Sequence, residues 1–338
     1  MLCDMPCFVL FIIFSFTDIE SLIQFKRLNK FYYAIITSFL KDPNFISQRL
    51  KKFSNYAIIC DPARGKLVNE NGKIQRMVVT PFEWTSFCFH CNGIICIFDR
   101  NLIETYLVNP AIKEFHRIPQ PETHAKILLG GMGLGFDSVA RNFKVIWIGI
   151  GSDHRTVVEI YSLSTDAWRV ITAPIPLKPY YKVFKTIFCD GVFYWSFSGM
   201  KRTSILCFNM YDEVLYTIPV PEIVYNKNKG WTITIFNGSF ALITYPLFQY
   251  IKLVVEVWVV DSLCPNVQWK KLLSIGPLAP HIQGTPLDFW KMDELLIHHP
   301  LGFGTSYNIR TRKTFGVLLS DMAFGYTPQF FSVRPRIQ

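Results

Sequence analysis

The chain has 338 residues and a formal net charge of +10, from 35 lysines and arginines against 25 aspartates and glutamates. Half of its residues are hydrophobic, which leaves little room for disorder, and the length suits two domains or one large closed β architecture. An aromatic share of 16% favours strands for most of the chain, because rings pack well on pleated surfaces.

The basic residues are scattered, so the charge does not indicate a dedicated nucleic-acid surface. The two densest groups are short: Lys26, Arg27 and Lys30, and then Arg49, Lys51 and Lys52. Nine cysteines stand mostly within apolar runs, where cysteine behaves as a small hydrophobe, and this indicates a reducing compartment.

The first apolar run, FVLFIIFSF, extends from Phe8 to Phe16. A signal peptide is not indicated, since Asp4 stands where basic residues belong and no small-residue cleavage site follows. Nine residues are also too few to span a bilayer. We therefore expect a buried helix of a soluble protein, without membrane contact.

The next stretch also has a helical pattern. Thr17 and Glu20 have the spacing of a capping box, in which each side chain bonds the other residue's amide. Apolar residues then recur at intervals of three and four, which places them on one face of a helix: Leu22, Phe25, Leu28, Tyr32, Ile35 and Ile36. Residues 1–48 are thus predicted to form a small helical head.

The rest of the chain contains a repeat. An apolar strand, a polar turn and a bulky aromatic residue recur about every 50 residues, ending at Phe115, Trp168, Tyr216, Trp269 and Phe315. Between them recurs a second unit, Asn or Asp followed by an apolar strand, at Asn92, Asn142, Asp190, Asn237 and Asp293.

Two strand pairs per period describe a four-stranded antiparallel blade, and several blades close radially into a kelch-like propeller. Five copies, and a weaker sixth around Tyr56 to Val79, fit residues 55–338. We expect the aromatic residue that ends each unit to pack between neighbouring blades. Trp168 is accordingly predicted to be a buried core residue.

The glycine-rich run GGMGLGF at residues 130–136 has two readings, a phosphate-binding loop or a tightly packed strand. A turn and a β-branched strand follow it, and a phosphate site would require a helix at that point. We therefore predict an inner strand at which backbones approach closely, and no nucleotide cofactor.

No catalytic or metal-binding constellation is evident. Cys88, Cys91 and Cys96 lack a second pair of ligands at zinc spacing, so buried thiols are expected. His298 and His299 would point to opposite faces of a strand. Asp residues near the turns are read as turn formers that bond local amides: Asp137, Asp166, Asp212 and Asp261.

The head resembles an F-box, the helical module that docks on a Skp-type adaptor and so joins a cullin ubiquitin ligase. Met5-Pro6 stands at the family's Leu-Pro, Ser21-Leu22 and Phe25-Lys26 at its central pairs, and Asn29-Lys30 with Tyr32 at its Ser-Lys-x-Trp. The resemblance implies adaptor contacts at nine residues: Met5, Pro6, Val9, Leu10, Ile13, Leu22, Phe25, Leu28 and Tyr32.

The repeats CNGIICI, LVNPAIKEFHRIP, GLGFDSVARNFKVI, VEIYSLSTDAWRVI and DGVFYWSF resemble the F-box-associated domain of plant F-box proteins. The fold class implied is mainly β, with a helical F-box head followed by a kelch-like propeller domain. The implied function is that of a non-catalytic substrate receptor, without a cofactor, whose propeller binds a target protein in the cytoplasm or also the nucleus.

The sequence departs from the F-box pattern at three places. Cys7-Phe8 replaces an acidic pair, Thr17-Asp18 replaces a second Leu-Pro, and Tyr32 replaces the tryptophan. One alternative is therefore a receptor or scaffold whose head no longer binds the adaptor. An alternative of another class is a propeller enzyme, which would require converging ligands at one mouth of the ring.

VVEVWVVD before Trp269 and KKLLSIGPL after it make the chain most similar to the S-locus F-box group, which acts in self-incompatibility. This resemblance implies a secreted style ribonuclease as the target. Cations in the inferred turns would then be candidates for target contacts at the propeller rim: Lys113, Arg141, Arg155, Lys201, Arg202 and Arg310.

Overall fold

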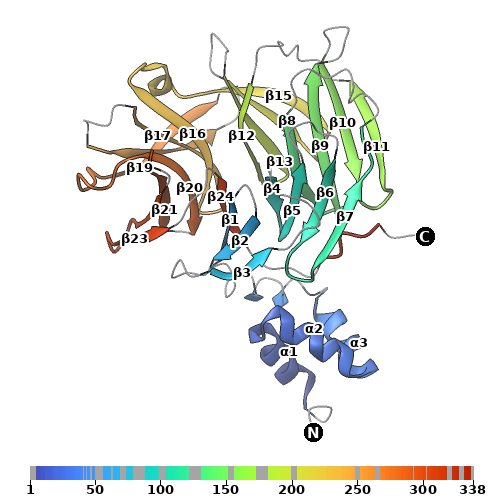
Figure 1. Ribbon diagram of the computed structural model, residues 1–338. Helices are drawn as coiled ribbons and strands as arrows, with labels where there is room; N and C mark the ends of the chain where they lie inside the picture. The colour runs from blue at the N-terminus through green and yellow to red at the C-terminus, as the bar shows by residue number, and fades with distance from the viewer. Residues whose placement is uncertain are drawn as a thin grey trace.

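The computed structural model describes residues 5–40, 42, 44–45, 48–49, 56–61, 64–68, 74–78, 88–98, 104–121, 131–150, 156–172, 182–198, 204–247, 252–262, 267–291, 293–301, 303–317, 322–326 and 331–335. In the described part of the head, three helices have defined bounds: α1 (Cys7–Phe16), α2 (Ile19–Leu28) and α3 (Lys30–Phe39). The head lies beside a ring of strands, at the N-terminal end of the chain (Figure 1).

Among the described residues, six four-stranded antiparallel sheets, which we number as blades, make up that ring (Figure 1). Blade 1 combines β24 (Met322–Tyr326), β1 (Tyr56–Asp61), β2 (Arg64–Val68) and β3 (Ile74–Val78). Blade 2 contains β4 (Cys88–Cys91), β5 (Ile94–Phe98), β6 (Thr105–Asn109) and β7 (Glu114–Ile118). Blade 3 contains β8 (Gly131–Asp137), β9 (Asn142–Ile150), β10 (Thr156–Ser162) and β11 (Ala167–Thr172).

Blade 4 contains β12 (Lys182–Cys189), β13 (Val192–Ser198), β14 (Ser204–Asn209) and β15 (Val214–Pro219), and a 3₁₀ helix (Glu222–Tyr225) follows it. Blade 5 contains β16 (Lys229–Phe236), β17 (Ser239–Pro246), β18 (Val255–Ser262) and β19 (Gln268–Ile275). Blade 6 contains β20 (Thr285–Lys291), β21 (Glu294–His298), β22 (Gly304–Asn308) and β23 (Thr314–Val317). The predicted propeller is thus confirmed, with the weak sixth copy as blade 1.

The two ends of each blade differ. We call the end where the first strand turns into the second, and the third into the fourth, the turn face. Asn92, Asp190 and Asn237 begin such turns with positive φ angles of 45°, 49° and 51°, each followed by a glycine at positive φ. Pairs of this kind match the right-handed twist of the strands that they join, which explains the recurring Asn/Asp-Gly in the sequence.

The ring closes through both ends of the propeller sequence. β24 pairs with β1, with Tyr326 opposite Tyr56, so the chain enters β1 and leaves β24 at the turn face. The segment 331–335 then packs against blades 2 and 3. The Phe331 ring lies 5.2 Å from that of Phe136, and the Asn109 side-chain amide donates to the Phe331 carbonyl at 2.7 Å.

The run GGMGLGF lies in β8, the first strand of blade 3, where residues 131–135 are buried. A Cβ atom at Gly133 would lie 2.5 Å from Cδ1 of Phe193, and one at Gly135 would lie 2.4 Å from Cε of Met210. Both distances are shorter than side chains allow. The run is thus an inner strand as predicted, but side chains of blade 4, and not a second backbone, pack closely on its glycines.

The head differs from its prediction in two respects. Asn29 ends α2 and begins α3, where its side chain accepts from the Tyr32 amide, so the apolar periodicity runs through two helices and not one. Asp18, and not Thr17, is the N-cap of α2, since its carboxylate accepts from the Ser21 amide at 2.8 Å. The Thr17 hydroxyl instead donates to the Ile13 carbonyl at the end of α1.

The aromatic residue that ends each repeat lies between blades in two cases. The indole N–H of Trp168 in blade 3 donates to the Pro119 carbonyl after β7, at 2.6 Å. That of Trp269 in blade 5 donates to the Pro219 carbonyl at the end of β15, at 2.8 Å. The prediction that Phe115 packs between blades is wrong, since 51% of its surface is exposed on β7.

Trp168 is only partly buried, so the prediction of a core residue is too strong. We expect Trp168→Ala to lower the free energy of unfolding by about 2 kcal/mol, from lost apolar burial and one hydrogen bond. Thermal unfolding of the full chain measures this loss. An unchanged melting temperature would mean that the ring contributes little to the contact between blades 2 and 3.

Candidate functional site

The first candidate surface is the outer face of α1. Phe8, Ile12 and Phe16 follow one another at intervals of four residues and are 67%, 50% and 57% exposed. Met5 and Ile13 lie on the same side, each 38% exposed. Residues four apart lie along one face of a helix, so these side chains form a continuous apolar row, which we call the α1 stripe.

The opposite face of α1 forms the core of the head. Leu10 and Phe14 are buried against Leu22, Tyr32 and Ile36 of the other two helices. The expectation that Phe8–Phe16 forms a buried helix is therefore wrong for one face, because Phe8, Ile12 and Phe16 are exposed. Among the described residues, no helix is long and apolar enough to cross a membrane.

The nine residues expected at the adaptor divide by burial. Leu10, Leu22 and Tyr32 lie in the interior of the head, and Phe25 packs partly against them. Met5, Pro6, Ile13 and Leu28 are exposed, and Val9 is half-buried. Only the exposed residues are available for direct contact, so the buried ones would act by holding the helices together.

Sequence reasoning missed three residues of the α1 stripe, Phe8, Ile12 and Phe16. The available signal was their spacing of four within an uninterrupted apolar run. The run itself does not reveal which side faces outward, because both sides are apolar.

The Tyr32 ring packs against Phe14, Phe25 and Phe31, with centroids 6.3, 5.9 and 5.4 Å away. Only 5% of Tyr32 is exposed. The replacement of the family tryptophan by tyrosine thus changes the packing of the interior of the head, and not its outer surface.

Arg49 is 6% exposed and holds the end of α1. Its guanidinium donates to the carbonyls of Phe14 and Thr17, at 2.8 and 2.6 Å, which satisfies backbone groups left open by the helix terminus. Burial lowers the pKa of Arg49 to about 10, against the opposing charge of Asp18. Arg49 is therefore structural and does not belong to a basic surface patch.

The Asp18 cap supports a testable expectation. Burial raises the pKa of this carboxyl, but hydrogen bonds from the Ser21 amide and hydroxyl outweigh it, so the net pKa is lowered. Because the pKa is lower in the folded state, the ionised cap stabilises the head at pH values above the unfolded pKa of about 3.9. This stabilisation is lost as the pH falls through the folded pKa.

We expect Asp18→Ala to destabilise α2 by about 1 kcal/mol and Asp18→Asn to retain most of the cap without its pH dependence. Hydrogen exchange at the Ser21 amide measures both effects. Equal protection in Asp18→Ala and the wild type would contradict the capping role.

Three of the six candidate cations of the propeller lie in the described part of the chain. Lys113, Arg141 and Arg310 are exposed in turns of the turn face, and Arg310 pairs with Asp293 at 2.8 Å. Arg155, Lys201 and Arg202 lie outside the described residues.

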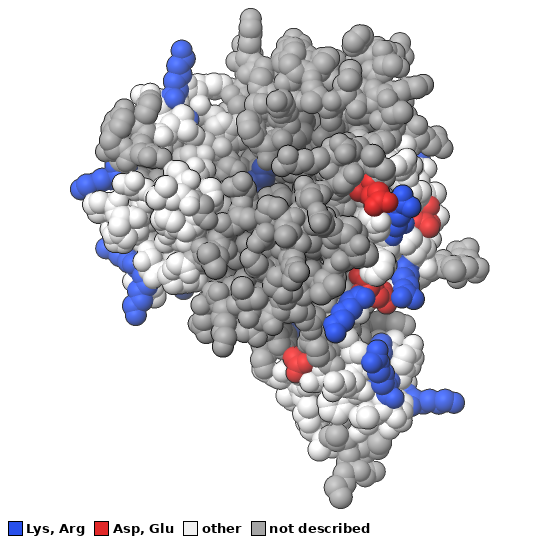
Figure 2. All heavy atoms as spheres, in the orientation of Figure 1, with Lys and Arg blue, Asp and Glu red and all other residues white. Residues whose placement is uncertain are grey.

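Figure 2 shows the charges of one side of the molecule as separate groups of both signs, on the head and on the propeller beside it. Near the axis, Lys185 of blade 4 donates to Asp288 of blade 6 at 3.0 Å and to the Leu287 carbonyl at 2.8 Å. Thr234 of blade 5 donates to the other Asp288 oxygen at 2.5 Å. The charges of Lys185 and Asp288 neutralise each other, and the hydrogen bonds of this group connect blades 4, 5 and 6. We therefore assign the group a structural role and not a role in acid–base catalysis.

His90 of β4 is the fourth side chain near this group. Desolvation by the surrounding strands lowers its pKa, against the opposing charge of Asp288, although His90 keeps an exposed surface.

The remaining candidates have structural positions. Cys91 and Cys96 are buried in β4 and β5, and burial raises the pKa of Cys91 to about 12, so its thiol is unreactive. His298 and His299 are both half-buried, and the His299 ring stacks on Phe303 at 4.2 Å. Within the described part of the chain, no three His, Cys, Asp or Glu side chains are placed to hold a metal.

Of the aspartates at the turns, Asp137 bonds local backbone amides as expected, whereas the Asp212 and Asp166 side chains bond other side chains. Asp137 accepts from the Val139 and Ala140 amides, and Asp212 accepts from the Asn209 side chain. Asp166 adopts a φ of 51° in its turn and accepts from the Tyr161 hydroxyl. The Asp261 side chain lies outside the described residues.

Comparison with known proteins agrees with this architecture. The F-box associated beta propeller domain family matches residues 63–317. An F-box/LRR-repeat/kelch-repeat protein of Arabidopsis thaliana is 26% identical over 205 residues, which cover 55% of this chain and 50% of the relative. A putative F-box/kelch-repeat protein of the same plant is 22% identical over 205 residues, covering 56% and 48%.

The chain thus spans about half the length of these curated relatives. The family match covers five complete blades and two of the four strands of blade 1, β2 and β3. The chain therefore belongs to the F-box associated β-propeller family, and the relatives that it matches are plant F-box proteins.

Proposed function

We propose that the chain is the substrate receptor of a Skp-cullin-F-box ubiquitin ligase. In this role the head binds the Skp-type adaptor, and the propeller holds a target protein near the ubiquitin-conjugating enzyme. The receptor contributes proximity and performs no chemical step.

The observation that carries the proposal is the α1 stripe on a helical head attached to an F-box associated propeller. A row of exposed Phe and Ile side chains on a helix is a typical anchor for a protein partner, because its burial on binding is favourable. The departure at Cys7-Phe8 extends this apolar surface, since Phe8 is its most exposed member. This arrangement favours a head that retains its docking surface over the scaffold alternative.

Isothermal titration calorimetry of the full chain with a purified plant Skp-type adaptor tests the proposal. We expect saturable binding with a negative heat-capacity change, the mark of apolar burial. Lack of binding at micromolar concentrations, with a folded head, would instead support the scaffold alternative.

A finer proposal concerns the target. The resemblance to the S-locus group supports a secreted style ribonuclease, and the net charge of +10 favours partners with acidic or neutral patches. The receptor would act in the cytoplasm or also in the nucleus. Binding of a style ribonuclease should weaken as salt rises above physiological strength. Affinity that is indifferent to salt, and to reversal of Lys201 and Arg202 to Glu, would contradict the electrostatic part of this proposal.

A further inference from the structure

The segment 331–335, which follows β24, lies against blades 2 and 3 without joining a sheet. Val333 is fully buried, and Phe331 is half-buried with its ring 5.3 Å from that of Phe143 in β9. Ser332, between these two residues, is exposed. The side chains at 331 and 333 therefore anchor the segment, and the one at 332 remains accessible.

Two side chains of blade 2 hold the backbone of this segment. The Asn109 amide group, which is fully buried, donates to the Phe331 carbonyl at 2.7 Å. Glu114, the first residue of β7, accepts from the Ser332 hydroxyl at 2.7 Å and from the Val333 amide at 3.3 Å, with the same carboxylate oxygen. Docking of the segment thus places the Ser332 hydroxyl directly against a carboxylate.

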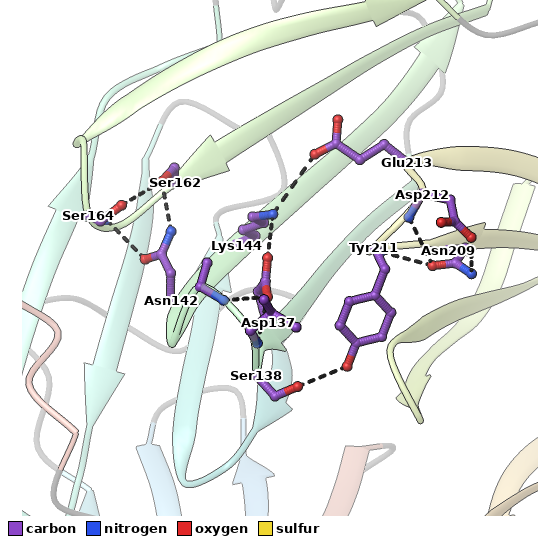
Figure 3. A network of polar contacts seen from close by, with 12 residues as sticks. Asp137, Ser138, Asn142, Lys144, Ser162, Ser164, Asn209, Tyr211, Asp212 and Glu213 are labelled. Atoms are coloured by element: carbon purple, nitrogen blue, oxygen red, sulfur yellow. Dashed lines mark hydrogen bonds and ion pairs between the residues drawn. The ribbon is translucent and has the colours of Figure 1, made fainter. Parts of the chain in front are cut away.

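The charge of Glu114 has no counter-ion. Among the described residues no lysine or arginine forms an ion pair with it, and Lys113, its neighbour in the sequence, is exposed in the preceding turn. In blade 3, by contrast, Asp137 is paired with Lys144 at 2.7 Å (Figure 3). Glu114 is therefore satisfied by hydrogen bonds from the segment, and a negative charge added at Ser332 would meet it unopposed.

Phosphorylation would turn this contact from attractive to repulsive. A protein kinase transfers the γ-phosphoryl group of ATP to the Ser332 oxygen, the bond to the β-phosphate oxygen breaks, ADP leaves, and the hydroxyl proton passes to the base of the kinase. The product carries a charge of about −1.5 to −2 at pH 7 and has lost the proton that Glu114 accepted. At this separation, well within the Debye length of about 8 Å, salt screens the repulsion little.

Arg334 does not remove this repulsion. Its amide donates to the Ser332 oxygen at 3.2 Å, and its side chain is exposed. Because Arg334 belongs to the same segment, an ion pair between its guanidinium and the phosphate would move with the segment and would not hold it on the propeller.

We propose that Ser332 is a phosphorylation site and that its phosphate releases the segment 331–335 from blades 2 and 3. Release uncovers the Phe136 and Phe143 rings and frees the Asn109 amide, so an apolar surface with a hydrogen-bond donor opens on the turn face. This inference goes beyond the receptor function and does not depend on it, since every contact involved lies within the propeller domain.

Hydrogen exchange of the Val333 amide reports docking, because this amide donates to Glu114. The full chain is compared with the same chain carrying phosphoserine at position 332, introduced by amber suppression. Exchange should be at least about tenfold faster with the phosphate. Ser332→Ala, which removes the hydroxyl without adding charge, should have a smaller effect. Equal exchange in the phosphorylated and unmodified chains would overturn the release.

Two further variants separate charge repulsion from other causes. Ser274→Glu adds a charge at an exposed serine of β19 in blade 5 and should leave Val333 exchange unchanged. Glu114→Gln keeps an acceptor for the Val333 amide and gains a donor for the phosphate. In that background phosphorylation should accelerate exchange by less than about threefold. Acceleration as large as in the chain with Glu114 would rule out repulsion by this carboxylate.

The modification itself is tested by mass spectrometry of the full chain, expressed in plant cells and purified with phosphatase inhibitors. We expect phosphate on Ser332 in the peptide that contains residues 331–335. Recovery of this peptide only in its unmodified form would overturn the phosphorylation site. Adaptor binding by Ser332→Ala should equal that of the wild type, so neither outcome bears on the receptor function.

Discussion

Replacing Phe8 and Ile12 with glutamate should weaken adaptor binding by more than about a hundredfold, as two anchor residues each contribute 2 kcal/mol or more to such interfaces. Both side chains are at least half exposed, so the substitutions leave the core of the head intact. Calorimetric titration with the Skp-type adaptor measures the loss, and hydrogen exchange in α2 and α3 verifies that the head stays folded.

The matched control carries the same two charges on the propeller. Val170→Glu and Leu272→Glu lie on the outer strands β11 and β19, at 52% and 48% exposure. This double variant should bind the adaptor like the wild type. Equal affinity of both double variants would place the docking surface elsewhere. Leu22→Ala with Phe25→Ala should also abolish capture, but with loss of head protection, because Leu22 is fully buried.

The second large effect is expected at Trp195 in the core of blade 4. Its indole is fully buried, stacks on Phe193 at 5.5 Å and donates to the Met132 carbonyl of blade 3 at 3.0 Å. Trp195→Ala should lower the free energy of unfolding by about 3–5 kcal/mol, through the cavity and the unsatisfied carbonyl.

Denaturant titration of the full chain, monitored by the circular dichroism of its β-sheets, measures this destabilisation. Tyr225→Ala serves as the control, since Tyr225 is 49% exposed and its loss should cost well under half as much. A loss at Trp195 no greater than that at Tyr225 would contradict the packing of blade 4 against β8.

The propeller was predictable from the sequence because its turns and close contacts restrict residue type. The turns at Asn92-Gly93 and Asp190-Gly191 require positive φ at both positions, and this produces a visible repeat. The glycines of β8 mark a place where Phe193 and Met210 leave no room for a side chain.

The closure of the ring was not predictable in the same way. β24 and β1 pair although most of the sequence separates them. Phe331, which packs beside Phe136, comes from a segment outside the repeat. Local periodicity carries no signal for such distant partners. It therefore found blade 1 only as a weak copy, without its innermost strand.

The head was predicted as helical but with the wrong cap and the wrong exposed side. Thr17 and Asp18 are adjacent and both suit an N-cap, and only the chain geometry selects Asp18. In α1 both faces are apolar, so the exposed Phe8 and the buried Leu10 look alike in the sequence.

Assembly of the full chain with recombinant Skp-type adaptor and cullin, followed by size-exclusion chromatography with light scattering, tests the receptor function most directly. The proposed function predicts a single complex of one receptor, one adaptor and one cullin, and its loss in the Phe8→Glu, Ile12→Glu variant. Separate elution of a folded receptor from a preformed adaptor–cullin complex would contradict it.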